Sequence, residues 1–404
     1  MVSVLEAERL ILSNIGESNI QNVPILESSG RVLAQEITAE RDYPPFDRVT
    51  MDGIGINFDI YNSGMRSFEV LGTVGAGDEP DTLSDVQGCL EVMTGAVCPP
   101  GVDCIIPVEM IKVENGIATI VEESPNISSG WNIHPKGSDC LAGSILLKPG
   151  LILNSASIAV AASEGAAEIK VSSKPRIAII SSGNELVALD QQPKPWQIRR
   201  SNSYTIAAQL EALKLADVEV FHVNDEKQAI TDRFKKLLGE FDMLIMSGAV
   251  SKGQFDYIPE VLDNLGVKKL FHRVTQRPGK PFWFGVSLDK KPVFALPGNP
   301  VSTVAGFTRY IIPALFKYVG AGDYEPVKVN LSKEFKFKKS LTYFLPAKIS
   351  QRGAEILAEP APVNGSGDFS ALAYTDGFVE LPAEQVEFPV DMEVDFYSWD
   401  KLNG

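Results

Sequence analysis

The fold is decided by the stretch Arg176-Ile177-Ala178-Ile179-Ile180-Ser181-Ser182-Gly183-Asn184-Glu185, in which a short apolar run ends in a polar, Gly-bearing turn. An uninterrupted apolar run of this length is typical of a strand that is covered on both faces, as in a parallel sheet. Similar patterns predict strands at 218–223, 243–246, 268–274 and 293–296, and helices at 203–215, 226–238 and 300–318. Strands that alternate with helices predict βαβ units, and ligands bind such sheets at the carboxyl ends of the strands.

The rest of the chain reads as smaller units around this α/β domain. A length of 404 residues is enough for several domains. Short alternating runs separated by turn residues predict β units before and after the α/β region. The predicted fold class is therefore α/β plus all-β, multidomain, with a central parallel-sheet α/β domain and flanking small β domains. The predicted domains are residues 1–45 with 140–172 as one discontinuous N-terminal domain, 46–139 as a small β domain, 173–322 as the α/β domain and 323–404 as a C-terminal β domain.

Composition and charge exclude several classes of protein. The net charge of −15 argues against extended binding to nucleic acid, which needs a broad face of Lys and Arg. The sequence has no signal-peptide pattern and no apolar run that could span a membrane, so we expect a cytoplasmic protein without a membrane partner. The four cysteines lack zinc-site spacing and the three histidines are far apart in sequence. A His-based metal site or catalytic triad is therefore disfavoured.

Four loops of the α/β region carry glycine at or near the end of a predicted strand. They are Ser181–Leu186, Ser247–Gly253, Gln276–Pro281 and Leu296–Ser302. Exposed backbone N–H groups and helix N-termini bind phosphate, so four such loops in one domain favour a phosphorylated, anionic ligand, although each alone is more often a simple turn. None matches the Walker P-loop or the G-x-G-x-x-G pattern, which disfavours nucleotide hydrolysis and dinucleotide redox chemistry. The candidate cofactor-binding residues are Gly183, Asn184, Ser247, Gly248, Ser251, Pro297, Gly298, Asn299, Pro300 and Ser302.

Charged residues in and beside these loops suggest what the ligand carries. Arg277 and Lys280 flank a Pro-Gly pair, and two fixed cations suit a phosphate, sulfate or molybdate, the alternative being a solvated surface pair. Glu185, Asp225 and Asp256 fall at three strand ends, where carboxylates beside phosphate usually hold Mg²⁺. Each of these acids alone is as well explained as a helix cap, Asp225 above all.

Taken together, the motifs of the whole chain resemble those of the molybdopterin molybdotransferases, a family whose module also forms the C-terminal part of the scaffold protein gephyrin. The resemblance rests on segments in one order: Pro44-Pro45-Phe46-Asp47-Arg48, Met51-Asp52-Gly53, Met93-Thr94-Gly95-Ala96, Gly137-Ser138-Asp139, Ser182-Gly183-Asn184-Glu185-Leu186, Arg200-Ser201-Asn202, Ser247-Gly248-Ala249-Val250-Ser251, Asp256-Tyr257, Pro278-Gly279-Lys280-Pro281, Leu296-Pro297-Gly298-Asn299-Pro300-Val301-Ser302 and Gly365-Ser366-Gly367.

The resemblance implies a reaction that joins adenylylated molybdopterin with molybdate to give molybdenum cofactor and AMP, with Mg²⁺ as the divalent cation. It implies a homodimer in which the discontinuous N-terminal domain serves as a linker and dimerisation domain and the α/β domain binds molybdopterin. The molybdopterin adenylyltransferase is then a candidate partner, because it supplies the adenylylated substrate.

The same resemblance assigns the candidate catalytic residues. Glu185, Asp225 and Asp256 fall in the pterin–AMP and metal site, and Arg277, Lys280 and Ser302 in the oxyanion pocket. Asp52, Thr94 and Asp139 face the α/β domain of the other subunit. The candidate catalytic residues are thus Asp52, Thr94, Asp139, Glu185, Asp225, Asp256, Arg277 and Lys280, and the candidate metal ligands are Glu185, Asp225 and Asp256.

Two alternatives stay open at this point. The first is a non-catalytic pterin-binding or scaffold protein of the same fold, suggested by gephyrin and by departures from the family pattern. This chain has Arg277 where the family often has Lys, and His134 and Lys136 where it often has Arg, while Lys348 is the candidate for the basic residue of the last domain. The second alternative is selectivity for tungstate over molybdate, which would leave the same motifs.

Overall fold

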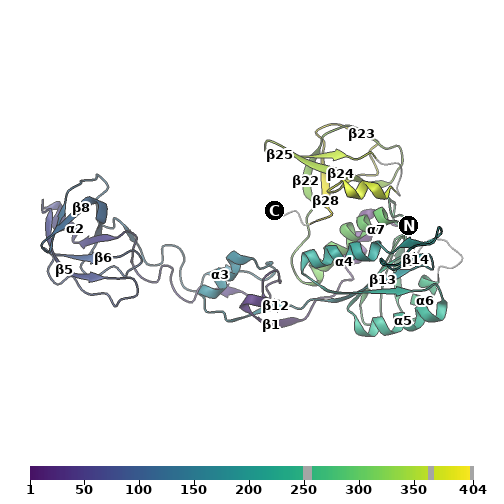
Figure 1. Ribbon diagram of the computed structural model, residues 1–404, viewed down its shortest axis with the longest axis horizontal. Helices are drawn as coiled ribbons and strands as arrows, with labels where there is room; N and C mark the ends of the chain where they lie inside the picture. The colour runs from purple at the N-terminus through teal and green to yellow at the C-terminus, as the bar shows by residue number, and fades with distance from the viewer. Residues whose placement is uncertain (249–256, 363–367, 401–404) are drawn as a thin grey trace. The chain divides into compact units, whose positions relative to one another are not determined.

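The computed structural model describes residues 1–248, 257–362 and 368–400 (Figure 1). The chain divides into two compact units. The larger unit comprises residues 1–35, 149–159 and 166–404, and the smaller unit comprises residues 36–148 and 160–165. These two units differ from the four predicted domains, whose boundaries stay a prediction.

The larger unit is built on a six-stranded sheet that confirms the predicted α/β region. Its strands, in spatial order, are β16 (Asp217–Val223), β13 (Arg176–Ser182), β17 (Met243–Ser247), β21 (Pro292–Leu296), β20 (Trp283–Val286) and β18 (Lys268–His272). The first four strands are parallel to one another, whereas β20 runs antiparallel to both of its neighbours. Every residue of β17 and β21 is buried, as continuous apolar runs predict.

Helices cover both faces of this sheet. α4 (Asn202–Leu213) and the helical segment that begins at Pro300 pack on the face formed by Ile177 and Ile179. α5 (Lys227–Glu240) and α6 (Ile258–Asn264) pack on the opposite face, formed by Ala178 and Ile180 (Figure 1). β13 lies between β16 and β17, so the chain order reverses direction at its carboxyl end. In α/β sheets such a switch point is where ligands bind.

A second six-stranded sheet forms the C-terminal part of the larger unit. Its strands are β19 (Gln276–Arg277), β24 (Thr342–Arg352), β25 (Glu355–Pro360), β22 (Val327–Leu331), β28 (Glu393–Ser398) and β26 (Gly377–Leu381), with a further pairing of β24 with β26. This sheet confirms the β structure predicted after the α/β region. β19 comes from the α/β region and pairs in parallel with the start of β24. The third predicted loop is therefore attached to the C-terminal sheet, which sequence patterns did not suggest.

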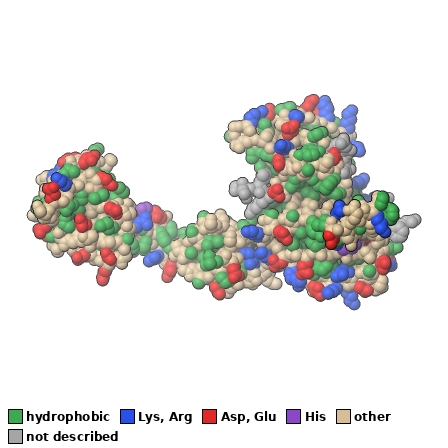
Figure 2. All heavy atoms as spheres, in the orientation of Figure 1, with side chains coloured by type: hydrophobic (Ala, Val, Ile, Leu, Met, Phe, Trp, Pro, Cys, Tyr) green, Lys and Arg blue, Asp and Glu red, His purple; other side chains and the backbone are tan. Residues whose placement is uncertain are grey.

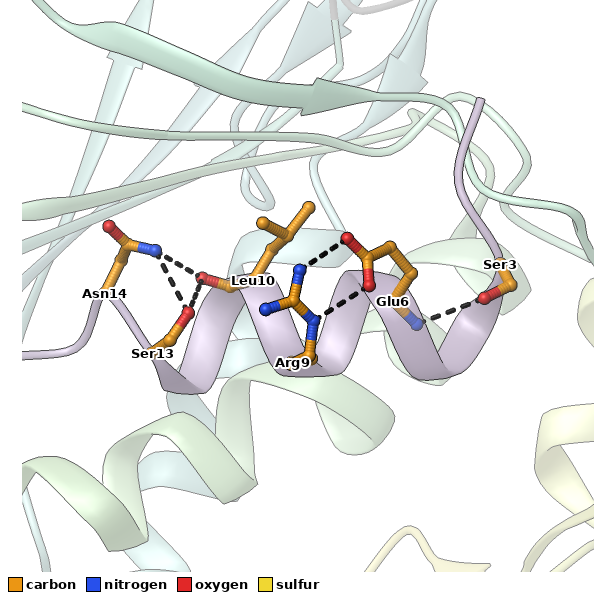
Figure 3. Close-up of polar contacts among 6 residues, drawn as sticks. All are labelled: Ser3, Glu6, Arg9, Leu10, Ser13 and Asn14. Atoms are coloured by element: carbon orange, nitrogen blue, oxygen red, sulfur yellow. Dashed lines mark hydrogen bonds and ion pairs between the residues drawn. The ribbon is translucent and has the colours of Figure 1, made fainter.

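The N-terminal helix α1 (Val4–Leu12) carries its own stop and start signals, as Figure 3 shows. The Ser3 hydroxyl accepts a hydrogen bond from the Glu6 backbone N–H at 3.1 Å, and the Asn14 side chain donates to the Leu10 carbonyl at 2.8 Å (Figure 3). Its apolar side packs into the same core as α4. β1 (Ile20–Pro24) then pairs with β12 (Glu168–Ser172), so two segments distant in sequence lie together. A second helix of this region is α3 (Ser155–Ser163).

The smaller unit is a β structure, as predicted. Its six-stranded sheet comprises β7 (Cys104–Pro107), β4 (Gly53–Ile56), β6 (Cys89–Val92), β5 (Ser67–Val74), β9 (Ile117–Ile120) and β8 (Ile111–Glu114). Smaller pairings join β3 (Arg48–Val49) to β10 (Ile133–His134) and β2 (Ile37–Thr38) to β11 (Ile145–Leu147). All four cysteines are free thiols.

Charged side chains of both signs are interspersed on the visible surface (Figure 2). Within the described ranges, the helices are too short or too polar to cross a membrane.

Candidate functional site

The first predicted loop lies at the carboxyl end of β13, where it contacts Asp225, the second residue after β16. The Ser182 hydroxyl donates to the Asp225 carboxylate at 2.5 Å, and the Asn184 side-chain oxygen accepts from the Asp225 backbone N–H at 3.2 Å. The carboxylate oxygens of Glu185 lie 2.6 and 2.7 Å from where a Cβ on Gly183 would be. Asp225 is not the N-cap of α5 (Lys227–Glu240), because Glu226 occupies that position. Its carboxylate instead accepts the hydrogen bond from the Ser182 hydroxyl at the end of β13.

The second loop requires a glycine at Gly248. Its φ is +102°, and a Cβ there would lie 2.6 Å from the Ser182 backbone oxygen. The Gly248 N–H donates to the Leu296 carbonyl at 3.1 Å. The ends of β13, β17 and β21 are therefore locked together through one residue that can carry no side chain. Ser251 and Asp256, which were also predicted for this loop, lie outside the described residues.

The fourth loop is joined to the second by Asn202. The Asn202 amide nitrogen donates to the Ser247 hydroxyl at 2.7 Å and to the Gly298 carbonyl at 2.9 Å. Asn299 caps the following helix α7 (Pro300–Gly306), since its side-chain oxygen accepts from the Ser302 N–H at 3.0 Å. The Asn202 side chain therefore bridges two strand-end loops.

A small polar pocket of about 80 Å³ opens between these loops. It is lined by Ser181, Ser182, Glu185, Leu186, Ile198, Arg199, Arg200, Ser201, Asn202, Ser203, Ser247, Gly248, Gly298 and Pro300. Two buried polar atoms of its lining, Arg200 Nε and Ser203 Oγ, have no hydrogen-bond partner in the described part of the chain. Unpaired buried donors are costly unless a ligand satisfies them. Arg199 and Arg200 make this pocket suited to an anion in an otherwise acidic protein.

The third loop carries the two predicted cations. The Arg277 guanidinium lies 5.7 Å from the Phe337 ring and 5.4 Å from the Tyr343 ring, and its Nε atom is buried without a partner among residues the structure describes. Lys280 is exposed. The Gly279 Cβ position lies 3.4 Å from the Ser302 carbonyl, so the third loop adjoins the fourth. The structure thus brings all four loops to one edge of the sheet.

The smaller unit brings together the remaining predicted residues in two pairs. The Asp52 carboxylate accepts hydrogen bonds from the Thr94 N–H and hydroxyl, both at 2.7 Å, and these bonds lower the pKa of Asp52. Asp139 lies 2.9 Å from His134 Nε2. The pairing of β3 with β10 places the strand that precedes Asp52 beside His134. Asp52 is therefore held as an oriented, ionised carboxylate.

Three residues of this site, Arg200, Asn202 and Ser203, had no predicted role. Arg200 and Asn202 stand in a motif that was recognised, and Ser203 follows it, but their neighbours come from distant strands. A run of Arg, Ser and Asn directly before a helix is the signal that could have found them. No group of three or more acidic, His or Cys side chains that could bind a metal is formed by the described residues, which do not include Asp256.

Three family models match successive parts of the chain. Residues 2–165 match the MoeA N-terminal region (domain I and II), residues 178–317 match a probable molybdopterin binding domain and residues 328–399 match the MoeA C-terminal region (domain IV). A relative from Synechocystis, named molybdopterin molybdenumtransferase, is 42% identical over 99% of this chain and 100% of its own length. A relative of the same name from Staphylococcus epidermidis is 32% identical over 94% of this chain and 91% of its own length.

Solved structures give the same result. A molybdopterin biosynthesis MoeA protein from Pyrococcus horikoshii is 30% identical with a TM-score of 0.81, covering 99% of both chains. A second structure of a MoeA protein from that organism is 27% identical with a TM-score of 0.83, covering 98% of this chain and 100% of its own.

Proposed function

Because this chain belongs to the MoeA family, whose relatives over its full length are named molybdopterin molybdenumtransferases, we infer that it is a transferase that inserts molybdenum into molybdopterin. The main structural support for this function is that four strand-end loops meet at one edge of the central sheet. Their pocket has unpaired buried donors at Arg200 and Ser203, and cations at Arg277 and Lys280 lie on the adjoining loop.

We propose that the molybdopterin is adenylylated and that AMP leaves on molybdenum insertion. A pyrophosphate link is a multiply charged group that needs several donors, and the pocket beside Arg200 offers guanidinium, hydroxyl and amide groups. Molybdate is a second anion, for which Arg277 and Lys280 are the available cations at the adjoining loop. These groups neutralise and orient two anions that would otherwise repel each other, which lowers the barrier by proximity and electrostatics. No covalent nucleophile is required.

We propose Mg²⁺ as the divalent cation of this site. Asp225 and Glu185 present carboxylate oxygens next to the Ser182 hydroxyl and to Gly183, and Mg²⁺ prefers such oxygen ligands together with phosphate. Asp256 is the third proposed ligand. Bound there, the cation would offset charge on the phosphate oxygens.

We also propose that the enzyme is a homodimer in which a second copy supplies Asp52, Thr94 and Asp139. Support comes from the orientation of the Asp52 carboxylate by Thr94, which gives that exposed acid a fixed position. The adenylylated substrate would come from the molybdopterin adenylyltransferase, with both enzymes in the cytoplasm.

The test is an AMP-release assay with purified protein, adenylylated molybdopterin and Mg²⁺, run with molybdate and with tungstate in parallel. Release is expected to depend on the oxyanion. Lys280→Ala should lower turnover at limiting molybdate by at least about tenfold, since one charge-assisted contact is lost. Lys269→Ala, which removes an exposed lysine on β18, is the matched control and should behave as wild type.

The alternative of a non-catalytic pterin-binding scaffold is less well supported, because full-length relatives are named as transferases. Substrate binding without AMP release above the no-enzyme control would favour it. Higher turnover with tungstate than with molybdate would change the assigned oxyanion and leave the site intact.

A further inference from the structure

The long helical segment after the fourth loop contains a widened turn. α7 is followed by a π-helical turn, η3 (Phe307–Ile311), and then by α8 (Ile312–Tyr318). Pro313 lacks the N–H that would bond to the Arg309 carbonyl in a regular helix, and its ring would collide with that carbonyl. Such π turns shift the side chains they carry and are frequent near functional sites. The polar side chains of this turn include Arg309 and Tyr310.

Arg309 ties three parts of the larger unit together. Its side chain is 4% exposed. The guanidinium donates to Glu8 of α1 at 2.7 and 3.1 Å and to Glu380 of β26 at 2.6 Å. Removing one partner from such a buried ion pair leaves a charge without compensation, so the arrangement is fixed. The π turn is therefore clamped between α1 and the C-terminal sheet.

Tyr310 reaches the third loop from the same turn. Its hydroxyl donates to the Gln276 side-chain oxygen at 2.5 Å, and the Gln276 amide nitrogen donates to the Gly279 carbonyl at 3.2 Å. Tyr310 and Gln276 are each 1% exposed. Because these two hydrogen bonds are buried, water cannot replace either of them if one partner is removed.

Gln276 also belongs to the backbone that links both sheets. It pairs with Thr342, and Arg277 pairs with Tyr343, at the start of β24. The loop is thus held on one side by the C-terminal sheet and on the other by the hydrogen bonds that run from Tyr310 through the Gln276 side chain to Gly279. Between these two supports lie Arg277, Gly279 and Lys280.

We propose that Tyr310 and Gln276 are positioning residues that hold the Arg277–Lys280 loop in the geometry that binds the oxyanion. Arg309 fixes the π turn from which Tyr310 acts. Neither Tyr310 nor Gln276 needs to touch the substrate. This inference rests on the proposed function of the loop as the molybdate site.

The test is the KM for molybdate in the AMP-release assay, measured on the full chain. Tyr310→Phe removes one hydroxyl and keeps the ring in the core. We expect the KM for molybdate to rise about tenfold while kcat changes less than about twofold, because a loop with one support lost binds the anion less well. Tyr397→Phe is the matched control, since the Tyr397 ring centroid also lies 5.1 Å from the Arg309 guanidinium carbon, while its ring stacks on Phe378 of β26. Its KM should equal that of wild type.

A second variant separates positioning from stability. Tyr310→Phe leaves the Gln276 oxygen buried without a donor, so its melting temperature should fall. Tyr310→Phe with Gln276→Met removes both polar groups and should recover part of that loss. If positioning is the role, the KM for molybdate stays raised in the double variant. A KM that returns to wild type as stability recovers would overturn the inference.

The outcomes also separate this inference from the proposed function. If Lys280→Ala raises the KM for molybdate and Tyr310→Phe leaves it within about twofold of wild type, the positioning role is wrong and the proposed function stands. If Lys280→Ala also leaves the KM unchanged, the loop is not the oxyanion site and both are wrong.

Discussion

Replacing Gly248 by alanine should disrupt the edge of the sheet at which the loops meet. The added Cβ would lie 2.6 Å from the Ser182 backbone oxygen, whereas real Cβ contacts are essentially never under 3.0 Å. Ser182 in turn bonds to Asp225. Any shift that relieves the collision therefore moves both the β13 end and a proposed metal ligand.

Two costs lower the free energy of unfolding of Gly248→Ala, and one smaller gain offsets them in part. Holding a residue with a side chain at a φ of +102° costs about 1–3 kcal/mol, and overpacking against backbone costs about 1–3 kcal/mol more. The smaller conformational entropy of unfolded alanine returns about 0.4–1 kcal/mol. We therefore expect a loss of roughly 1–5.6 kcal/mol, whose upper part is a large share of the stability of a typical domain.

The assay is urea unfolding together with AMP release at limiting substrate. Gly239→Ala is the matched control, because Gly239 lies in α5 with nothing within 4 Å of the new Cβ. That control should unfold at the same urea concentration or a higher one and keep full activity. If Gly248→Ala matched wild type in both unfolding and turnover, the close approach of the three strand ends would be needed for neither stability nor activity.

Three further perturbations follow from other parts of the molecule. Arg309→Met should lower the free energy of unfolding by about 3–5 kcal/mol, since it leaves Glu8 and Glu380 without their cation, and a loss below about 1 kcal/mol in urea unfolding would contradict this. Burial raises the pKa of the Cys89 and Cys104 thiols to about 12, above the ordinary value of 9.0. Their contribution to stability is complete below pH 9 and is lost as pH rises toward 12, so the free energy of unfolding should fall above pH 9, and less so in the double alanine variant. Thr94→Val removes one of the bonds that lower the pKa of Asp52, so an NMR titration should find that pKa raised toward its usual value. An unchanged Asp52 titration would mean that the backbone N–H alone orders the carboxylate.

The parallel strands could be predicted because their signal is local. The apolar run before Ser181 is long enough to be covered on both faces, and the structure buries it so. β24 was missed although it is the longest strand of the C-terminal sheet, because Pro346 stands inside it and proline usually excludes a strand interior. β20 was missed because its aromatic run follows directly on the Pro-Gly-Lys-Pro turn.

Within the site, the loops could be predicted from the sequence, but the contacts between them could not. Whether Asp225 caps a helix or faces the first loop depends on Ser182, which is distant in sequence and adjacent only in the sheet. The bridge made by Asn202 and the chain from Tyr310 through Gln276 likewise join residues from different elements. Contacts of this kind follow from strand order and helix packing, which local patterns do not specify.

The most direct test of the account is to measure AMP released and molybdenum retained in the same reaction, with adenylylated molybdopterin, Mg²⁺ and molybdate supplied to the purified protein. Wild-type protein and Lys269→Ala should give equimolar amounts of AMP and pterin-bound molybdenum, whereas Lys280→Ala should lose both at limiting molybdate. Release of AMP without retention of molybdenum, or no release above the no-enzyme control, would contradict it.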